Sequence, residues 1–125
     1  ALVRIPGSTR KRLEFRAGDC TCNPYLLLTA LLAAGIDGFE RETAPGEPAQ
    51  FDLGHASDDQ LRGKDIKMLP RSAGEALDAI EADDVVMSAL GPVCGPELLR
   101  IKRYELARYE VEVGEWERNV YLERV

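Results

Sequence analysis

Polar and apolar side chains alternate along residues 10–17, and residues 12–17 are predicted to form a β-strand with two different faces. One face carries a carboxylate among guanidinium groups: Arg10, Arg12, Glu14 and Arg16. The other face is apolar: Leu13, Phe15 and Ala17. Residues 1–5 predict a second strand, and the turn-forming stretch 6–8 joins the two strands. Because two strands alone are marginally stable in water, we expect them to need neighbours from outside this sequence.

The stretch from Pro24 to about residue 42 has the apolar density of a buried α-helix. Asn23 is a good N-cap, and proline suits the first helical turn. Apolar side chains point in nearly every direction around the axis: Leu26, Leu27, Leu28, Ala30, Leu31, Leu32, Ala33 and Ala34. A helix that is apolar all round is buried in something large, so we expect a further partner to cover it.

Residues 43–69 are rich in proline and glycine, which predicts a long irregular loop that is functional or wrapped over a larger body. His55 lies in this loop, and we expect it to be solvated rather than catalytic. The pattern Ser72-Ala73-Gly74-Glu75 then fits a capping box. The helix that it opens is expected to turn three side chains inward: Ala76, Leu77 and Ile80.

Asp83 or Asp84 is expected to cap a short helix over residues 85–90, which Gly91-Pro92 ends. The alternative, that these two carboxylates form a paired acid site, is less favoured. Residues 97–121 predict a long helix or two abutting helices, with Gly114 as the break. Two apolar stripes along them are interpreted as core packing: Leu98, Ile101, Tyr104, Ala107 and Val111, then Val113, Trp116 and Val120.

The charged face of residues 10–17 has two interpretations, and spacing alone does not choose between them. Exposed ion pairs of this kind are usually a solvated ladder of salt bridges. The same residue types can instead form a site for a metal ion and a phosphorylated substrate. A carboxylate holds Mg²⁺, which usually also binds phosphate oxygens, and arginines grip phosphate or carboxylate in a two-pronged way.

Composition narrows the class of protein. The chain has 125 residues, 45% of them hydrophobic and 30% charged, which is enough for one domain with a modest core. A net charge of −6 argues against nucleic-acid binding, which needs a basic footprint. The longest apolar run, residues 25–36, is too short to span a bilayer, and no signal peptide is visible. We therefore expect a cytoplasmic location and no membrane partner.

Three cysteines are too few for a disulfide framework, so free thiols in a reducing compartment are expected. Cys20 and Cys22 bracket a single residue, and Cys94 is distant in sequence. A metal site built on them is disfavoured because His55 is the sole histidine, and we expect small buried thiols beside the turn. The sequence opens inside a strand pattern, which predicts a piece of a longer chain or a subunit that completes another one.

Several motifs resemble the closing part of the glutamine synthetase catalytic domain. They are Arg4-Ile5-Pro6, Leu13-Glu14-Phe15-Arg16 with Asp19, Asn23-Pro24-Tyr25-Leu26 and Ala34-Gly35-Ile36-Asp37-Gly38. The resemblance extends over residues 1–125. It implies an α+β fold that is incomplete as an independent unit: two antiparallel strands within residues 1–17, followed by mostly helices over residues 23–125. The long loop at about 43–69 would interrupt these helices.

The resemblance also implies a role for each charged residue of the strands. Glu14 resembles the family's metal-binding glutamate, and Arg16 resembles the catalytic arginine that contacts glutamate and the transferred phosphoryl group. Arg4 resembles an arginine on the nucleotide side, and Arg12 is expected to reach the nucleotide as well. Asp19 and Asn23 are expected to be structural. The turn between the strands looks short for the family, so Arg10 has no certain counterpart.

The implied activity is ATP-dependent joining of glutamate to ammonia or a small amine through a γ-glutamyl phosphate, with Mg²⁺ or Mn²⁺ as cofactor. The family's other metal-binding glutamates and its metal histidine are absent from this sequence. We therefore expect the remainder of a glutamine synthetase subunit as partner, within a ring-shaped oligomer. Two alternatives stay open: a non-catalytic scaffold or regulatory subunit with the same fold, and an independent small acidic interaction domain.

Overall fold

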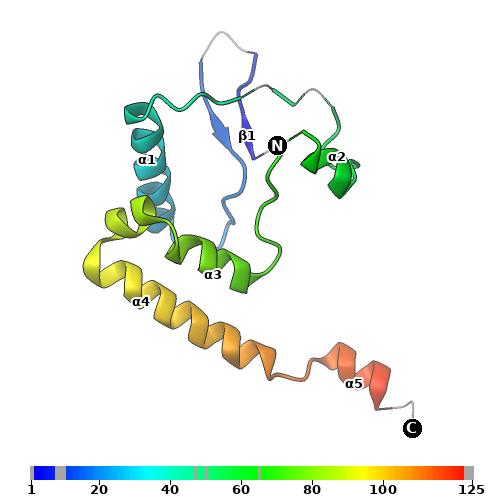
Figure 1. Cartoon of the computed structure of the whole chain (residues 1–125). Helices are drawn as coiled ribbons and strands as arrows, with labels where there is room; N and C mark the ends of the chain where they lie inside the picture. Colours follow the sequence, from blue (N-terminus) through cyan, green and yellow to red (C-terminus); the bar gives the residue numbers. More distant parts are fainter. Residues whose placement is uncertain (1, 8–10, 47, 50, 65, 123–125) are drawn as a thin grey trace. The chain divides into compact units, whose positions relative to one another are not determined.

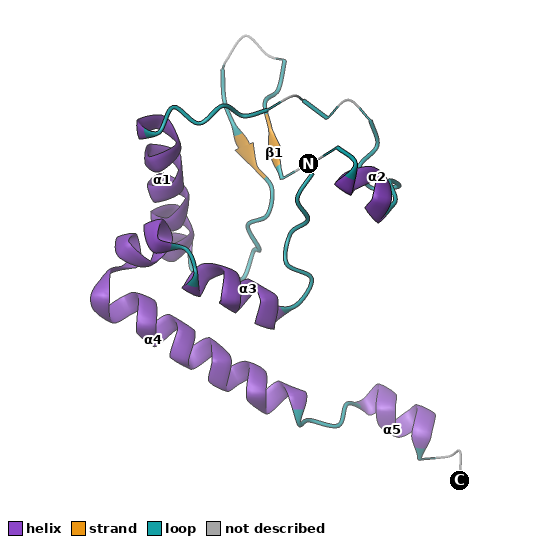
Figure 2. Ribbon diagram, in the orientation of Figure 1, coloured by secondary structure: helices purple, strands orange, loops and turns teal. Residues whose placement is uncertain are grey.

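The computed structural model describes residues 2–7, 11–46, 48–49, 51–64 and 66–122 (Figure 1). The chain divides into two compact units, Ala1–Leu69 and Pro70–Val125. Figure 2 shows one small sheet in the first unit and helices in both. Two antiparallel strands followed mostly by helices are what the sequence predicts, so the expected α+β class is confirmed.

The sheet of the first unit is formed by β1 (Val3–Arg4) and β2 (Glu14–Phe15), which pair antiparallel. Arg4 lies directly opposite Glu14, and Val3 lies opposite Phe15. The backbone N–H of Arg16 donates to the carbonyl oxygen of Leu2 at 2.9 Å, which extends the ladder by one more pair. Both strands lie inside the predicted ranges 1–5 and 12–17, and both are shorter than those ranges.

Helix α1 (Pro24–Glu40) begins where the sequence predicts. The side-chain oxygen of Asn23 accepts from the backbone N–H groups of Tyr25 and Leu26 at 3.0 and 3.3 Å. Pro24 occupies the first turn, where a missing N–H leaves no helical hydrogen bond unmade. The asparagine cap and the proline therefore fix the start of this helix.

The surface of α1 remains largely uncovered by the described part of the chain. None of its residues is buried. Five large side chains are exposed and follow each other at helical spacing of three or four, so they form one face: Tyr25, Leu28, Leu32, Ile36 and Phe39. The described residues therefore do not supply the burial that so apolar a helix needs.

The predicted irregular stretch 43–69 contains a short helix that the sequence analysis missed, α2 (Asp58–Arg62). A capping box starts it: Ser57 Oγ accepts from the Gln60 N–H at 3.3 Å, and Gln60 Oε1 accepts from the Ser57 N–H at 2.9 Å. Leu61 is buried and anchors this turn. The spacing Ser-x-x-Gln is the signal that could have predicted it.

In the second unit, α3 (Ala73–Glu81) packs against α4 (Asp84–Glu110). Leu77 of α3 and Leu99 of α4 are the buried apolar side chains described in this unit. Ser72 Oγ accepts from the Glu75 N–H at 3.1 Å, so the predicted helix start is confirmed. The prediction that Ala76 points inward was wrong, because that residue is exposed.

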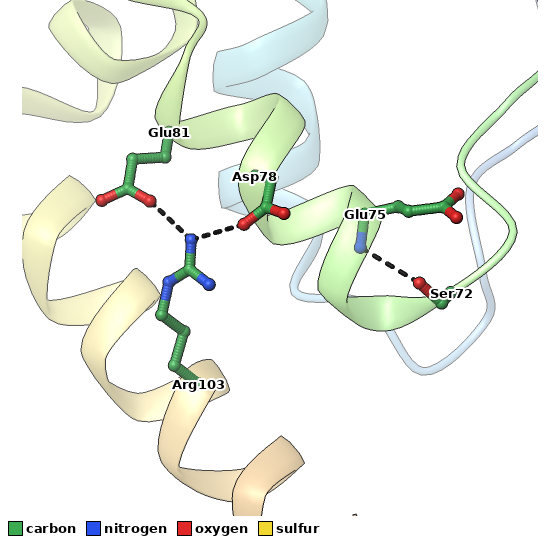
Figure 3. A network of polar contacts seen from close by, with 5 residues as sticks. All are labelled: Ser72, Glu75, Asp78, Glu81 and Arg103. Atoms are coloured by element: carbon green, nitrogen blue, oxygen red, sulfur yellow. Dashed lines mark hydrogen bonds and ion pairs between the residues drawn. The ribbon is translucent and has the colours of Figure 1, made fainter.

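Arg103 of α4 ties the two helices together by a charged contact (Figure 3). Its Nη2 donates to Asp78 Oδ1 at 2.8 Å and to Glu81 Oε2 at 2.5 Å. These carboxylates, Asp78 first, raise the pKa of the Arg103 guanidinium. All three side chains are substantially exposed, so the contact orients α3 on α4 more than it stabilises the pair.

Asp83 caps α4, accepting from the Val85 and Val86 N–H groups at 3.0 Å each, so the capping interpretation of the two aspartates is confirmed. Gly91 has φ 81° and ψ 171°, a conformation open essentially to glycine alone, and it kinks α4 where the sequence predicts a helix end. Gly95 is buried just beyond the kink. A Cβ there would stand 3.0 Å from Met87 Cε, so the kinked backbone approaches Met87 closely.

Helix α5 (Glu115–Tyr121) follows the predicted break, with Gly114 as its N-cap residue. The two apolar stripes predicted to be core are mostly exposed, so that interpretation was wrong for this chain. Their exposed members include Ile101, Tyr104, Val111, Val113 and Trp116. The nine residues of α3 cover only a narrow strip of α4, and Leu99 and the half-buried Leu106 lie in that strip.

Candidate functional site

The candidate site is a carboxylate held between two guanidinium groups on the small sheet. Arg4 Nη1 lies 3.1 Å from Glu14 Oε2. Arg12 contacts the other oxygen, Oε1, through Nε at 3.1 Å and through Nη2 at 2.9 Å. Strand pairing places Arg4 opposite Glu14, and the two-residue period places Arg12 on the same face. The sequence predicted that Arg12 and Glu14 share a face, whereas the position of Arg4 beside Glu14 comes from the strand pairing.

Glu14 is the least exposed member of the cluster. Its side chain is 30% exposed, against 56% for Arg4 and 52% for Arg12. Oε1 is contacted by two nitrogens of Arg12, whereas Oε2 is contacted by one nitrogen of Arg4 and keeps capacity for a further contact. Two positive charges beside one negative charge leave the cluster with an excess positive charge, which suits a polyanionic ligand.

Arg16 lies two residues beyond Glu14, so alternation puts it on the same face. Its backbone is fixed by the hydrogen bond to Leu2, while its side chain is exposed. It forms no ion pair with any residue that the structure describes. Arg10, which the sequence analysis placed on this face, lies outside the described residues.

The loop after β2 is ordered by Asp19. Its Oδ1 accepts from the backbone N–H of Thr21 at 2.7 Å and from the Thr21 hydroxyl at 2.5 Å. The hydroxyl first, and then the N–H, lower the pKa of the Asp19 carboxyl. Together with Asn23 at the start of α1, this residue has the local bonding expected of a structural role.

The part of the chain that the structure describes does not form a complete metal centre by itself. Among the described residues, no group of three or more histidine, cysteine, aspartate or glutamate side chains could hold a metal ion. Glu14 fits the part of a single oxygen ligand, the type that Mg²⁺ and Mn²⁺ prefer. The remaining ligands would have to come from outside the described residues.

The three cysteines are exposed, which corrects the expectation of buried thiols. Cys20 and Cys22 lie in the loop between β2 and α1, where the described part of the chain packs nothing over them. The sequence predicted burial because free cysteine is among the most buried residue types, and a local pattern does not show what packs over a loop.

His55 is solvated, as predicted, with 89% of its side chain exposed. Its Nδ1 lies 2.6 Å from Asp52 Oδ2, a local pairing that the sequence analysis did not foresee. The imidazole first, and then the Gly54 N–H, lower the pKa of the Asp52 carboxyl. Aspartate three residues before histidine in a tight loop is the signal that could have indicated this pair.

Comparison with known proteins identifies the family. The model of the glutamine synthetase catalytic domain matches residues 1–121. The chain is 46% identical over 122 residues to the glutamate–methylamine ligase of Methyloversatilis universalis, and 38% identical over 126 residues to the glutamine synthetase of Halobacterium salinarum. A solved structure described as apo GmaS without ligand superposes with a TM-score of 0.76 at 33% identity.

These matches show that the chain belongs to the glutamine synthetase family, as the motifs at residues 4–38 indicated. They cover 98% and 99% of this chain but only 27% and 28% of the two relatives. The solved structure is covered to 27% of its length. The chain thus corresponds to part of a glutamine-synthetase-type catalytic domain, which agrees with the predicted carboxy-terminal portion.

No helix of the described residues is both long and apolar enough to cross a bilayer.

Proposed function

We propose that this chain contributes part of the active site of an ATP-dependent ligase that joins glutamate to ammonia or a small amine. In the proposed reaction, ATP phosphorylates the side-chain carboxylate of glutamate, and the amine then displaces phosphate. The activity requires the remainder of the subunit. Support comes from the family match and from the names of the relatives, a glutamate–methylamine ligase and a glutamine synthetase.

The observation that carries the proposal is the Arg4–Glu14–Arg12 cluster on paired strands. Glu14 is proposed as one ligand of a Mg²⁺ or Mn²⁺ ion, whose chemistry when bound is to neutralise phosphate oxygens. A metal ion that binds the Glu14 carboxylate has to compete with the guanidinium groups of Arg4 and Arg12. The family match over residues 1–121 favours this role over a plain surface ladder of salt bridges, because such a ladder would bind no ligand.

The arginines are proposed to bind anionic groups. Arg4 and Arg12 would take phosphate oxygens of the nucleotide, exchanging one guanidinium N–H from Glu14 to phosphate. Arg16, whose side chain is exposed, would contact glutamate and the transferred phosphoryl group. Phosphoryl transfer is accelerated mainly by positioning and by charge neutralisation, and guanidinium groups on a fixed strand supply both.

The test is Glu14→Gln in the complete subunit. The amide keeps the shape but loses the negative charge, so both metal binding and the two ion pairs weaken. We expect turnover to fall by about 10²–10³-fold, the usual loss when one preorganised electrostatic group is removed. The Mg²⁺ concentration for half-maximal rate should rise in parallel. A matched control is Glu40→Gln at the last residue of α1, with unchanged kinetics.

Unchanged turnover of the Glu14→Gln subunit would refute the site. Calorimetric titration with Mg·ATP then decides the alternative class. Absence of binding heat, together with wild-type activity of Arg4→Ala, would favour a non-catalytic scaffold or regulatory subunit.

Methylamine is proposed as the amine substrate, because the relative that is 46% identical is a glutamate–methylamine ligase. Initial rates with methylamine and with ammonia at equal free-amine concentration would compare the two substrates directly. A higher specificity constant for ammonia would point to the glutamine synthetases instead. A ring-shaped oligomer and a cytoplasmic location stay predictions.

A further inference from the structure

In the part of the protein that the structure describes, two exposed thiols stand one residue apart in the loop that joins β2 to α1. Cys20 and Cys22 lie between the strand that carries Glu14 and the cap of α1 at Asn23. The role of this pair is not part of the proposed ligase chemistry. Exposure is the first requirement for thiol chemistry, because oxidants and exchange partners must reach the sulfur.

The backbone between the thiols is folded into a turn. The Cys22 N–H donates to the Asp19 carbonyl oxygen at 3.1 Å, which closes a four-residue turn with Cys20 and Thr21 at its centre. The Asp19 carboxylate holds the same turn from its side chain through the Thr21 N–H at 2.7 Å. The conformation of the Cys-Thr-Cys segment is therefore set by local hydrogen bonds.

A turn of this kind is expected to bring the two cysteines within disulfide range. Two successive Cα–Cα steps of about 3.8 Å, folded at about a right angle in a turn, leave the outer Cα atoms about 5.4 Å apart. An extended Cys-x-Cys segment would separate them by about 7 Å. Disulfides need Cα atoms about 4.4–6.8 Å apart, so the turn meets a condition that an extended segment misses.

We propose that Cys20 and Cys22 form a reversible dithiol–disulfide site that exchanges with low-molecular-weight disulfides. One thiolate attacks a sulfur of the disulfide RSSR, forming a protein–S–SR mixed disulfide and releasing RS⁻. The second thiolate attacks the protein sulfur, forming the Cys20–Cys22 bond and releasing the second RS⁻. Two electrons pass from the protein to RSSR, and two protons leave the thiols.

The bond is expected to be readily reversible. A ring spanning a single intervening residue gains little loop-closure entropy, and such a small ring is strained. Exposed and strained disulfides have relatively oxidising potentials and belong to the labile class rather than the structural class. The closed ring would stiffen residues 20–22, directly before Asn23 and four residues after Arg16.

The test uses the complete subunit and a peptide that contains both thiols. Trypsin cleaves after Arg16 and after Arg41 with no basic residue between them, so residues 17–41 form one peptide. In the reduced folded protein, N-ethylmaleimide should add twice to this peptide. After equilibration with excess glutathione disulfide it should add to neither cysteine, and the peptide should be lighter by two hydrogen atoms. Dithiothreitol should restore both additions.

Single substitutions distinguish ring closure from other thiol chemistry. Cys22→Ser and Cys20→Ser should each leave a stable glutathione adduct on the remaining thiol. Cys94→Ser, which removes an exposed thiol 72 residues further along the chain, should leave ring closure unchanged.

The proposal is overturned by any of three results: no alkylation of either thiol in the folded subunit, two glutathione adducts on the wild-type peptide, or a cross-link to another cysteine. The readout is a peptide mass and not turnover. Failure here would therefore leave the proposed ligase function untouched, and failure of the ligase assay would leave this site untouched.

Discussion

Asn23 connects the loop after the candidate site to the start of α1, and its removal gives a sharp prediction. Its side-chain oxygen accepts from two backbone N–H groups, Tyr25 at 3.0 Å and Leu26 at 3.3 Å. Asn23→Ala deletes that acceptor, so both groups lose their partner in the first turn. Loss of such a cap costs about 1 kcal/mol, within a range of about 0.5–2 kcal/mol.

The magnitude converts directly into local opening of the helix. A free-energy change of about 1 kcal/mol raises the open population of the first turn about 5-fold. Amide hydrogen exchange in the complete subunit measures this population residue by residue. The Tyr25 and Leu26 amides should therefore exchange about 5-fold faster in Asn23→Ala, within a range of about 2- to 30-fold, while amides in the middle of α1 change less.

Two controls isolate the cap. Asn23→Asp keeps an acceptor oxygen and adds a negative charge at the positive end of the helix, so protection should be kept or increased. Asn119→Ala changes the same residue type inside α5 and should leave the α1 amides unaffected. Wild-type exchange rates at Tyr25 and Leu26 in Asn23→Ala would refute the capping argument.

Further predictions test other parts of the chain. Gly91→Ala should destabilise the subunit by about 1–3 kcal/mol in denaturant titration, because φ 81° with ψ 171° is essentially closed to other residues. Gly74→Ala is its matched control: the added Cβ meets Leu106 Cδ2 at an ordinary 3.8 Å, so the helical site should gain about 0.5–1 kcal/mol, and equal effects would contradict the strain argument. The His55 imidazole lowers the pKa of the Asp52 carboxyl in the folded protein. The stability that the Asp52–His55 pair adds is therefore present above the pKa of an unfolded aspartate, and it is lost as pH falls through the lowered native pKa. His55→Ala should move the carboxyl titration of Asp52 upward in carbon-13 NMR, and an unmoved midpoint would exclude the pairing.

Local signals in the sequence located the helices well. Asn23-Pro24, Ser72-x-x-Glu75 and Asp83 each mark an observed helix start, because a side-chain cap depends on neighbouring residues alone. The short helix α2 was missed although Ser57 and Gln60 carry the same kind of signal. The glycines and prolines of residues 43–69 favoured the prediction of a loop, so the capping box within this stretch was not recognised.

Burial was the weaker part of the sequence analysis. The stripe through Ile101 and Tyr104 has helical spacing, yet α3 covers the neighbouring strip with Leu99. Periodicity shows that a helix has an apolar face, and it does not show which element covers that face. The exposure of Cys20 and Cys22 has the same origin, since solvent access depends on what packs over a loop.

The candidate site likewise has one part that the local pattern predicted and one part that strand pairing decided. Alternation along residues 10–17 determined that Arg12, Glu14 and Arg16 share a face, and the family motifs pointed to their chemistry. Only the tertiary structure decided the register that sets Arg4 opposite Glu14, because pairing depends on contacts between strands ten residues apart in sequence. Helix starts and the alternation of side chains along a strand depend only on neighbouring residues, so the sequence by itself determined them. Register, burial and thiol exposure were decided by packing between distant segments, which a local pattern does not contain.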